Sequence, residues 1–255
     1  MTTALLTDTV AQNLASAADL ALLWGVDGVA LRSVGRDRVP HVNEAAVGAR
    51  LRETELELLL VDPGLFAPGS GRAVWMNEVA AFDETAAFCR RLGARTVRCG
   101  ALDGGPGAVD ALRALGDAAA AAGLRLAVGN EAEGAATGAA LAELLVAVAH
   151  PAVGADWRPA EALAAGETGG GEALVAAGVP VFAAEMRDPD AAGADQTPGE
   201  GSVGWAETLA TLAAAGFDGP LVLDLRGARH ADAPRRTVGL RWATAAIRLA
   251  RAAQP

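Results

Sequence analysis

The segment Val153–Pro159 reads V-G-A-D-W-R-P and is the part of the sequence that best indicates the fold. An apolar strand pattern over Val153–Asp156 leads into a Trp-Arg pair, and a helical stretch over Ala160–Ala165 follows at once. This order places Arg158 where a strand passes into its loop. In parallel α/β barrels, that end of a strand is where the functional side chains lie.

The same order of strand and helix recurs along the 255 residues of the chain. Short apolar runs predict strands at Ala4–Leu6, Gly28–Arg32, Leu56–Val61, Thr96–Cys99, Leu124–Val128, Val153–Asp156, Pro180–Met186 and Pro220–Leu225. Eight strand-then-helix units in a chain of this length predict an α/β fold, a single (β/α)8 TIM barrel that takes up residues 1–255 as one domain.

Amphipathic patterns predict the helices between these strands. They cover Ser16–Trp24, Asn43–Glu53, Glu78–Leu92, Val109–Ala122, Thr137–Val148, Ala160–Ala165, Glu172–Ala177, Trp205–Ala215 and Thr237–Ala252. Thr137 is expected to cap its helix. The segment Asp188–Val203 is rich in Gly, Pro and Asp, and we expect it to form a mobile lid.

Composition and charge limit the classes of partner. Hydrophobic residues make up 52% of the chain, which is enough for a large core, and the net charge of −10 argues against a nucleic-acid partner. No segment resembles a signal peptide or a membrane-spanning helix, so we expect a cytoplasmic protein with no membrane partner. Cys89 and Cys99 lack metal-ligand spacing and are expected to be buried free thiols.

Segments spread over nearly the whole chain resemble the xylose isomerase-like barrel superfamily, the sugar phosphate isomerases and epimerases. These segments are Gly25–Val34, Leu92–Arg98, Ala122–Asn130, Thr137–Leu145, His150–Ala160, Gly199–Trp205 and Gly216–Leu225. The resemblance implies the barrel fold and an isomerase- or epimerase-like enzyme. It leaves the oligomeric state open, and a homodimer is one of the assemblies that it allows.

The resemblance also implies a divalent metal with four ligands, and the sequence departs from that pattern. The positions that match the ligands of strands five, six and eight hold Gly129, Arg158 and Asp224. On strand seven, Ala183 and Glu185 stand where two histidines are usual. Arg158 would place a positive charge inside the coordination sphere. We therefore expect no cofactor and disfavour a divalent metal such as Mn²⁺ or Mg²⁺.

Charged residues at the strand ends indicate a different chemistry. A guanidinium binds carboxylate or phosphate through two parallel hydrogen bonds and stays charged. We predict that Arg158 is an oxyanion clamp and that Glu185 and Asp224 are the general acid and base. The reaction would be a metal-independent isomerisation, epimerisation, or a repurposed lyase, cyclase or dehydration step in specialised metabolism, on a small anionic hydroxy or keto substrate. Further substrate contacts are expected from Arg32, Arg98, Asn130, Glu131, Asp156, Trp157, Arg187, Arg226, His41 and Trp75.

Two other functions remain open from the sequence. In the first, Arg158 only forms a salt bridge with Glu185 or Asp224 that plugs a vacated metal site, and the barrel binds a ligand or a partner without catalysis. In the second, metal chemistry persists through substituted ligands, with Glu131 or Asp156 as a third oxygen donor.

Several of the candidate residues also have ordinary structural explanations. Arg32 and Arg98 alternate with apolar strand residues and can pair with acids near the barrel rim. A histidine in a loop, such as His41, is more often a surface residue than a catalyst. Trp157 and Trp75 can equally pack beneath a loop.

Overall fold

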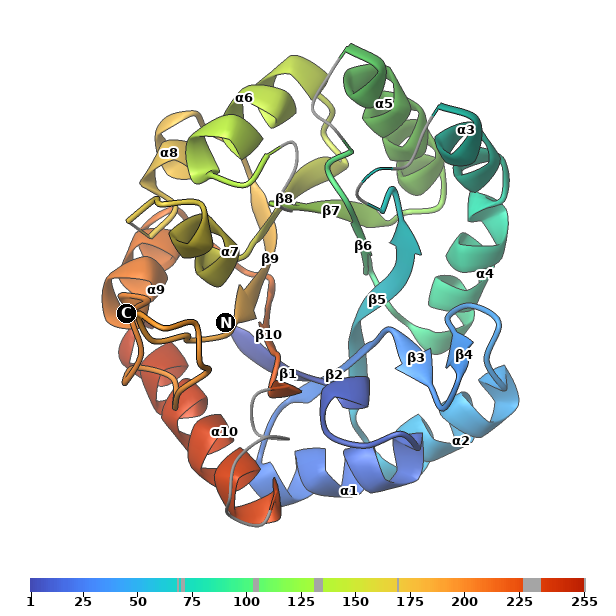
Figure 1. Ribbon diagram of the computed structural model, residues 1–255. Helices are drawn as coiled ribbons and strands as arrows, with labels where there is room; N and C mark the ends of the chain where they lie inside the picture. Colours follow the sequence, from blue (N-terminus) through green and yellow to red (C-terminus); the bar gives the residue numbers. More distant parts are fainter. Residues whose placement is uncertain are drawn as a thin grey trace.

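The computed structural model describes the chain except residues 68, 70–71, 103–105, 131–134, 169, 227–234 and 255, and it describes only the backbone of residues 106 and 235–236. Eight parallel strands close into one barrel in the order β1-β10-β9-β8-β7-β6-β5-β2, with the helices packed around it (Figure 1). This confirms the predicted single (β/α)8 barrel.

Each predicted strand is found in the barrel. The barrel strands are β1 (Thr2–Leu6), β2 (Gly28–Leu31), β5 (Glu57–Leu65), β6 (Thr96–Cys99), β7 (Arg125–Gly129), β8 (Val153–Trp157), β9 (Val181–Met186) and β10 (Pro220–Leu223). A short antiparallel hairpin of β3 (Ser33–Val34) and β4 (Asp37–Arg38) follows β2. The hairpin was not predicted, because strands of two residues carry no periodic pattern.

The helices also follow the prediction, except that one predicted helix is divided into two. They are α1 (Leu14–Trp24), α2 (Glu44–Thr54), α3 (Arg72–Ala80), α4 (Phe82–Leu92), α5 (Pro106–Ala121), α6 (Gly138–Val148), α7 (Pro159–Ala164), α8 (Glu172–Ala176), α9 (Trp205–Ala214) and α10 (Arg235–Ala252), with a 3-10 turn η1 (Thr7–Thr9) after β1. Thr137 caps α6 as predicted, because its hydroxyl accepts a hydrogen bond of 3.1 Å from the Ala140 amide. None of the helices in the described residues is long and apolar enough to cross a membrane.

The division falls within the helix that was predicted over Glu78–Leu92, which is interrupted at Ala81. Before the break, α3 buries no side chain completely, whereas α4 begins with the buried Phe82 and continues with Ala86 and Cys89 against the barrel. The predicted helix therefore corresponds to α4 and to the last residues of α3, a separate helix whose Val79 is only partly buried against the core.

Strand β5 runs four residues farther than predicted. The sequence predicts that this strand ends at Val61, but β5 continues through Asp62, Pro63 and Gly64 to Leu65. The pairing with β6 shifts register between Val61 and Leu65, so the Pro-Gly pair makes an irregularity inside the strand rather than its end. This correction matters for the site, since it keeps Asp62 within the barrel wall.

The interior of the barrel is filled by a layer of mostly small apolar side chains. These are Ala4, Leu6, Ala30, Leu60, Ala127, Phe182, Ala183 and Val222. Neighbouring residues such as Leu5, Val97 and Ala184 point outward and pack under the helices. Because side chains alternate along a strand, the same interior is faced, nearer the carboxyl-terminal end, by the residues two positions beyond Leu6, Ala30, Leu60, Ala127, Ala183 and Val222.

The loop between β9 and α9 folds around one buried carboxylate. The Asp188 carboxylate accepts hydrogen bonds from the amides of Gly199 (2.7 Å), Gly201 (3.1 Å) and Val203 (2.9 Å). Burial raises the pKa of Asp188, although these three N–H groups act in the opposite direction. The end of the expected lid is therefore anchored to its beginning, and its motion stays a prediction.

Candidate functional site

The carboxyl-terminal end of the barrel carries a layer of charged residues above the apolar interior. Each strand supplies one position near or just beyond its end, two residues past an inward-facing one: Asp8, Arg32, Asp62, Arg98, Gly129, Asp156, Glu185 and Asp224. The alternation of the strands thus brings seven ionisable side chains to one end of the barrel, with Gly129 as the exception.

Arg98 occupies the centre of this layer and is buried. Its Nε lies 2.8 Å from Oδ2 of Asp156, without hydrogen-bond alignment, and its Nη2 donates to Oδ1 of Asp156 at 3.2 Å. Its Nη1 lies 2.8 Å from Oε2 of Glu185 and 3.8 Å from Oδ2 of Asp62. Burial alone would lower the pKa of Arg98, but these carboxylates keep it above its usual value. Arg98 therefore holds three carboxylates together.

Glu185 is the carboxylate whose ionisation the arginines change most clearly. Burial alone would raise the pKa of Glu185, but the charges of Arg98, Arg158, Arg226 and Arg32 outweigh burial and lower it to about 2. The side chain is therefore ionised at neutral pH and is a weak base while the cavity holds no anion. An anion bound to the same arginines would offset their charge and raise the pKa of Glu185 again.

Arg158 fills the space that the glycine on β7 leaves open. A Cβ at Gly129 would lie 2.8 Å from both Cζ and Nη2 of Arg158. The Arg158 backbone is fixed by Asn130, whose Oδ1 accepts from the Arg158 amide at 2.8 Å and whose Nδ2 donates to the Arg158 carbonyl at 3.0 Å. Nε of Arg158 donates to Oδ2 of Asp156 at 2.9 Å. The guanidinium is thus held where a longer residue at 129 would project.

Three more arginines are each oriented by one carboxylate. Nε and Nη2 of Arg32 donate to the two carboxylate oxygens of Asp8 at 2.8 and 3.0 Å. Both the backbone amide of Arg226, at 3.0 Å, and its Nε, at 2.6 Å, donate to Asp224. The third arginine is Arg38 of the β3–β4 hairpin, which is oriented by Asp62.

Arg38 reaches the barrel from the hairpin. Its Nη2 donates to Oδ1 of Asp62 at 3.0 Å, and the Gly64 amide donates to the same oxygen at 3.1 Å. The guanidinium also packs over Gly64, where a Cβ would overlap it. The extension of β5 past Asp62 therefore creates the surface that positions Arg38.

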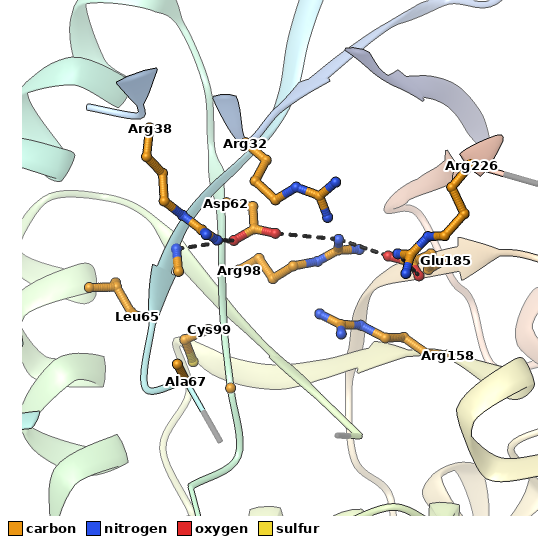
Figure 2. A pocket seen from close by; sticks show the side chains of 12 residues that line it. Arg32, Arg38, Asp62, Leu65, Ala67, Arg98, Cys99, Arg158, Glu185 and Arg226 are labelled. Carbon is orange, nitrogen blue, oxygen red and sulfur yellow. Dashed lines mark hydrogen bonds and ion pairs between the residues drawn. The ribbon is translucent and has the colours of Figure 1, made fainter. Parts of the chain in front are cut away.

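These groups surround a cavity of about 360 Å³, within the size range of small-molecule sites (Figure 2). Its lining residues are Arg32, Arg38, Asp62, Gly64, Leu65, Ala67, Arg98, Cys99, Gly100, Arg158, Glu185 and Arg226. Five are arginines and two are acids, so the surface that faces a ligand is positive, while Asp8, Asp156 and Asp224 lie behind the arginines. Such a surface attracts anions, even though the whole chain is acidic.

The residues of the cavity do not fit a divalent cation. The guanidinium of Arg158 stands beside Gly129, at the position where the family resemblance implies ligands, and the Glu185 carboxylate is engaged by Arg98. Within the described residues, no group of three or more Asp, Glu, His or Cys side chains has the arrangement of a metal site. Two guanidinium groups next to the carboxylates would oppose the charge of a metal ion.

Most of the predicted site residues meet at this cavity, and several do not. Arg32, Arg98, Arg158, Glu185 and Arg226 line it, as the sequence suggested. Asn130, Asp156 and Asp224 are buried behind it and orient the arginines. Glu131 lies outside the described residues.

Trp157 is a correction to the expected substrate contacts. Its side chain is fully buried and packs on the far side of the strand, against the positions of Gly138 and Gly171. Because Trp157 follows the inward-facing Asp156 directly, strand alternation turns it outward, under the helices. The structural explanation for this residue was the correct one.

His41, Trp75 and Arg187 also lie away from the cavity. His41 is largely exposed and has Glu84 at 3.9 Å. Trp75 belongs to α3, where Arg72 stacks over its ring at 6.0 Å. Arg187 lies just beyond β9 and pairs with Asp195 of the following loop and with Glu161 of α7. The expectation that these side chains contact the substrate does not fit their positions.

Three residues of the site were missed from the sequence. Asp8 and Asp62 follow the inward-facing Leu6 and Leu60 by two residues, so counting two positions from an inward-facing residue would have found them. Arg38 had no such signal, because it reaches the cavity from a hairpin outside the barrel. Cys99 lines the cavity wall, and both cysteines are buried thiols, as predicted; burial raises the pKa of Cys89 to about 12.

A sequence model of the xylose isomerase-like TIM barrel family matches residues 18–246. The chain belongs to this family. No curated protein sequence matches the chain at a significant level. The match extends over nearly the whole barrel and includes every residue that lines the cavity.

Solved structures share the fold at low sequence identity. A xylose isomerase-like TIM barrel/4-hydroxyphenylpyruvate dioxygenase fusion protein superposes with a TM-score of 0.82 at 20% identity over 98% of this chain, which spans 42% of the fusion protein. A xylose isomerase domain protein from Alicyclobacillus acidocaldarius has a TM-score of 0.79 at 21% identity over 99% of both chains. An L-ribulose 3-epimerase has a TM-score of 0.73 at 16% identity over 99% of this chain and 96% of its own.

Proposed function

We propose that the protein is an isomerase- or epimerase-like enzyme that transfers a proton on a small anionic hydroxy or keto substrate without a divalent metal. The observation that carries the proposal is the position of the Arg158 guanidinium in the space beside Gly129, within a cavity lined by five arginines. A guanidinium can supply the positive charge that stabilises a developing enolate oxygen, and it needs no metal ligands to do so.

Glu185 is the proton-transferring group in this proposal. It lines the cavity, whereas Asp224 is buried behind Arg226, so Asp224 serves as a positioning residue rather than as the second acid or base. Binding of an anionic substrate to Arg158 and Arg226 raises the pKa of Glu185 from its low value in the empty cavity. Substrate binding therefore makes the base stronger at the moment when it is needed.

The test is solvent exchange at carbon. The chelator-treated protein is incubated in D₂O with ribulose 5-phosphate, dihydroxyacetone phosphate or 2-ketoglutarate, and deuterium entry beside the carbonyl is followed by proton NMR. We expect exchange with at least one probe, lost by more than about a hundredfold in Glu185→Gln. Arg95→Gln, an exposed arginine at the other end of the barrel, is the matched control and should exchange normally. Exchange that depends on added Mn²⁺, or that survives Glu185→Gln, would refute the proposal.

One observation favours a second function. Each arginine of the cavity is already paired with a carboxylate, as expected for a salt-bridge network that stabilises the mouth of a non-catalytic binding barrel. In that case the protein binds anions but promotes no exchange with any probe, and the Glu185→Gln variant changes binding alone.

A further inference from the structure

The arginines of the cavity differ widely in how much of each is available to a ligand. The side chains of Arg98 and Arg158 are 3% and 13% exposed, whereas those of Arg38 and Arg226 are 49% and 47% exposed. The first pair forms the interior of the charged network. The second pair is open to a molecule that enters from solvent.

The two open arginines belong to opposite walls of the barrel. In the closed strand order, β5 and β9 are four strands apart in either direction and therefore face each other. Arg38 is bonded to Asp62 of β5, and Nη2 of Arg226 lies 4.0 Å from Oε1 of Glu185 on β9. Figure 2 shows Arg38 and Arg226 at the two sides of the cavity, with Arg98 between them.

Both open guanidinium groups are fixed before any ligand arrives. Asp62 and the backbone at Gly64 hold Arg38, and Asp224 holds Arg226 through its backbone amide and its Nε. A charged group that is already oriented loses little conformational entropy when it binds an anion. Each arginine therefore has the properties of a separate, preorganised anion site.

The middle of the cavity holds ion pairs rather than an open arginine. Asp62 and Glu185 both face it, and Nη1 of Arg98 lies between them, 3.8 Å from the first and 2.8 Å from the second. The separation between Oδ2 of Asp62 and Oε2 of Glu185 is therefore at most the sum of these two distances. A neutral carbon centre suits this position, and anionic groups suit the two ends.

We propose that the ligand of this cavity carries two separate anionic groups, one bound by Arg38 at the β5 wall and the other by Arg226, with Arg158, at the wall of β8 to β10. The uncharged part of the ligand then lies over the ion pairs that Arg98 forms with Asp62 and Glu185. This inference uses the cavity of the proposed function and specifies its substrate class as a dianion, such as a dicarboxylate or a phosphorylated acid.

The test is calorimetric titration at constant ionic strength with malonate, succinate, glutarate and adipate, each compared with its monoamide. The monoamide has the same size and one charge fewer, so the comparison isolates the second anionic group. We expect one chain length to bind best, about tenfold or more tightly than its monoamide. Arg38→Gln and Arg226→Gln should each remove this advantage and leave the monoamide affinity within about twofold, because one anion site remains.

Arg95→Gln serves as the control and should keep the advantage, and the unfolding midpoint of each variant shows that it is folded. If no dicarboxylate binds more than twofold better than its monoamide, absence of binding included, the two-anion inference is wrong. The result is independent of turnover: a dianion advantage without deuterium exchange refutes only the proposed catalysis, and exchange without the advantage refutes only the two-anion site.

Discussion

At the amino-terminal end of the barrel, a cavity of about 910 Å³ opens among the first residues of β1, β5, β6 and β10, whereas the cavity at the other end measures about 360 Å³. The larger cavity holds exposed charges: in the pair of Arg125 and Asp218, the side chains are 46% and 69% exposed. In the pair of Arg98 and Asp156 at the smaller cavity, they are 3% and 0% exposed.

The difference shows that volume alone does not mark a functional site. Exposed ion pairs are screened by water and contribute little to stability. Buried charges are costly unless they are paired, so a network such as that around Arg98 requires a reason to persist. At the carboxyl-terminal end of the barrel, the charged groups surround one small cavity. At the amino-terminal end, here called the floor of the barrel, the charged groups are exposed to solvent. Four predictions test this contrast.

The largest effect is expected from Arg98→Met. This change leaves the buried carboxylates of Asp156 and Glu185 without their shared partner, and we expect a loss of about 3–5 kcal/mol in the free energy of unfolding. Urea denaturation measures the loss. The matched change at the floor, Arg125→Met, should cost at most about 1 kcal/mol. Similar losses for the two variants would show that burial does not distinguish the two ends.

The pH dependence of stability should come next in size. The pKa of Glu185 is lowered from 4.5 to about 2, so its contribution is fully present above pH 4.5 and is lost as the pH falls through 2. The contribution is on the order of 3 kcal/mol. Glu185→Gln should be less stable at neutral pH and should lose less stability than the wild type between pH 4.5 and 2. Asp218→Asn, at the exposed floor pair, should retain the full acid dependence.

Gly129→Ala should have an intermediate effect. The new methyl group would overlap the Arg158 guanidinium, and we expect a loss of stability of about 1–3 kcal/mol together with weaker anion binding. The control is Gly107→Ala on α5, where a Cβ meets nothing within 4 Å, and this change should leave both properties intact or stabilise the helix slightly. An unchanged anion affinity in Gly129→Ala would separate Arg158 from the ligand site.

The smallest effect concerns anion binding at the two ends. Inorganic phosphate in excess should raise the melting temperature of the wild type by about 2–4 °C. Arg226→Gln should lose most of this shift, and Arg95→Gln, at the floor cavity, should retain it. Equal shifts in both variants would mean that phosphate binds without regard to the cavity.

Much of this structure could be predicted from the sequence, since short apolar runs between helical patterns locate all eight barrel strands. The alternation also explains which strand-end residues reach the cavity: Glu185 follows the inward-facing Ala183 by two positions, whereas Trp157 follows the inward-facing Asp156 by one and packs under the helices.

Other parts of the site depend on geometry that a local pattern does not contain. Pro63 and Gly64 are common turn residues, and only the pairing with β6 shows that they lie within a strand. Arg38 reaches the cavity from a hairpin of two-residue strands. Gly129 ends β7 and Arg158 follows the neighbouring strand β8, so the sequence does not show that the two residues are in contact. Gly129 considered by itself indicates only that a side chain is absent.

That pairing also couples the two positions sterically. A side chain at position 129 would overlap the Arg158 guanidinium where it now lies, so a residue larger than glycine there requires the guanidinium to move. The size of residue 129 therefore controls where the cation of residue 158 lies in the cavity, although residue 129 itself carries no charge.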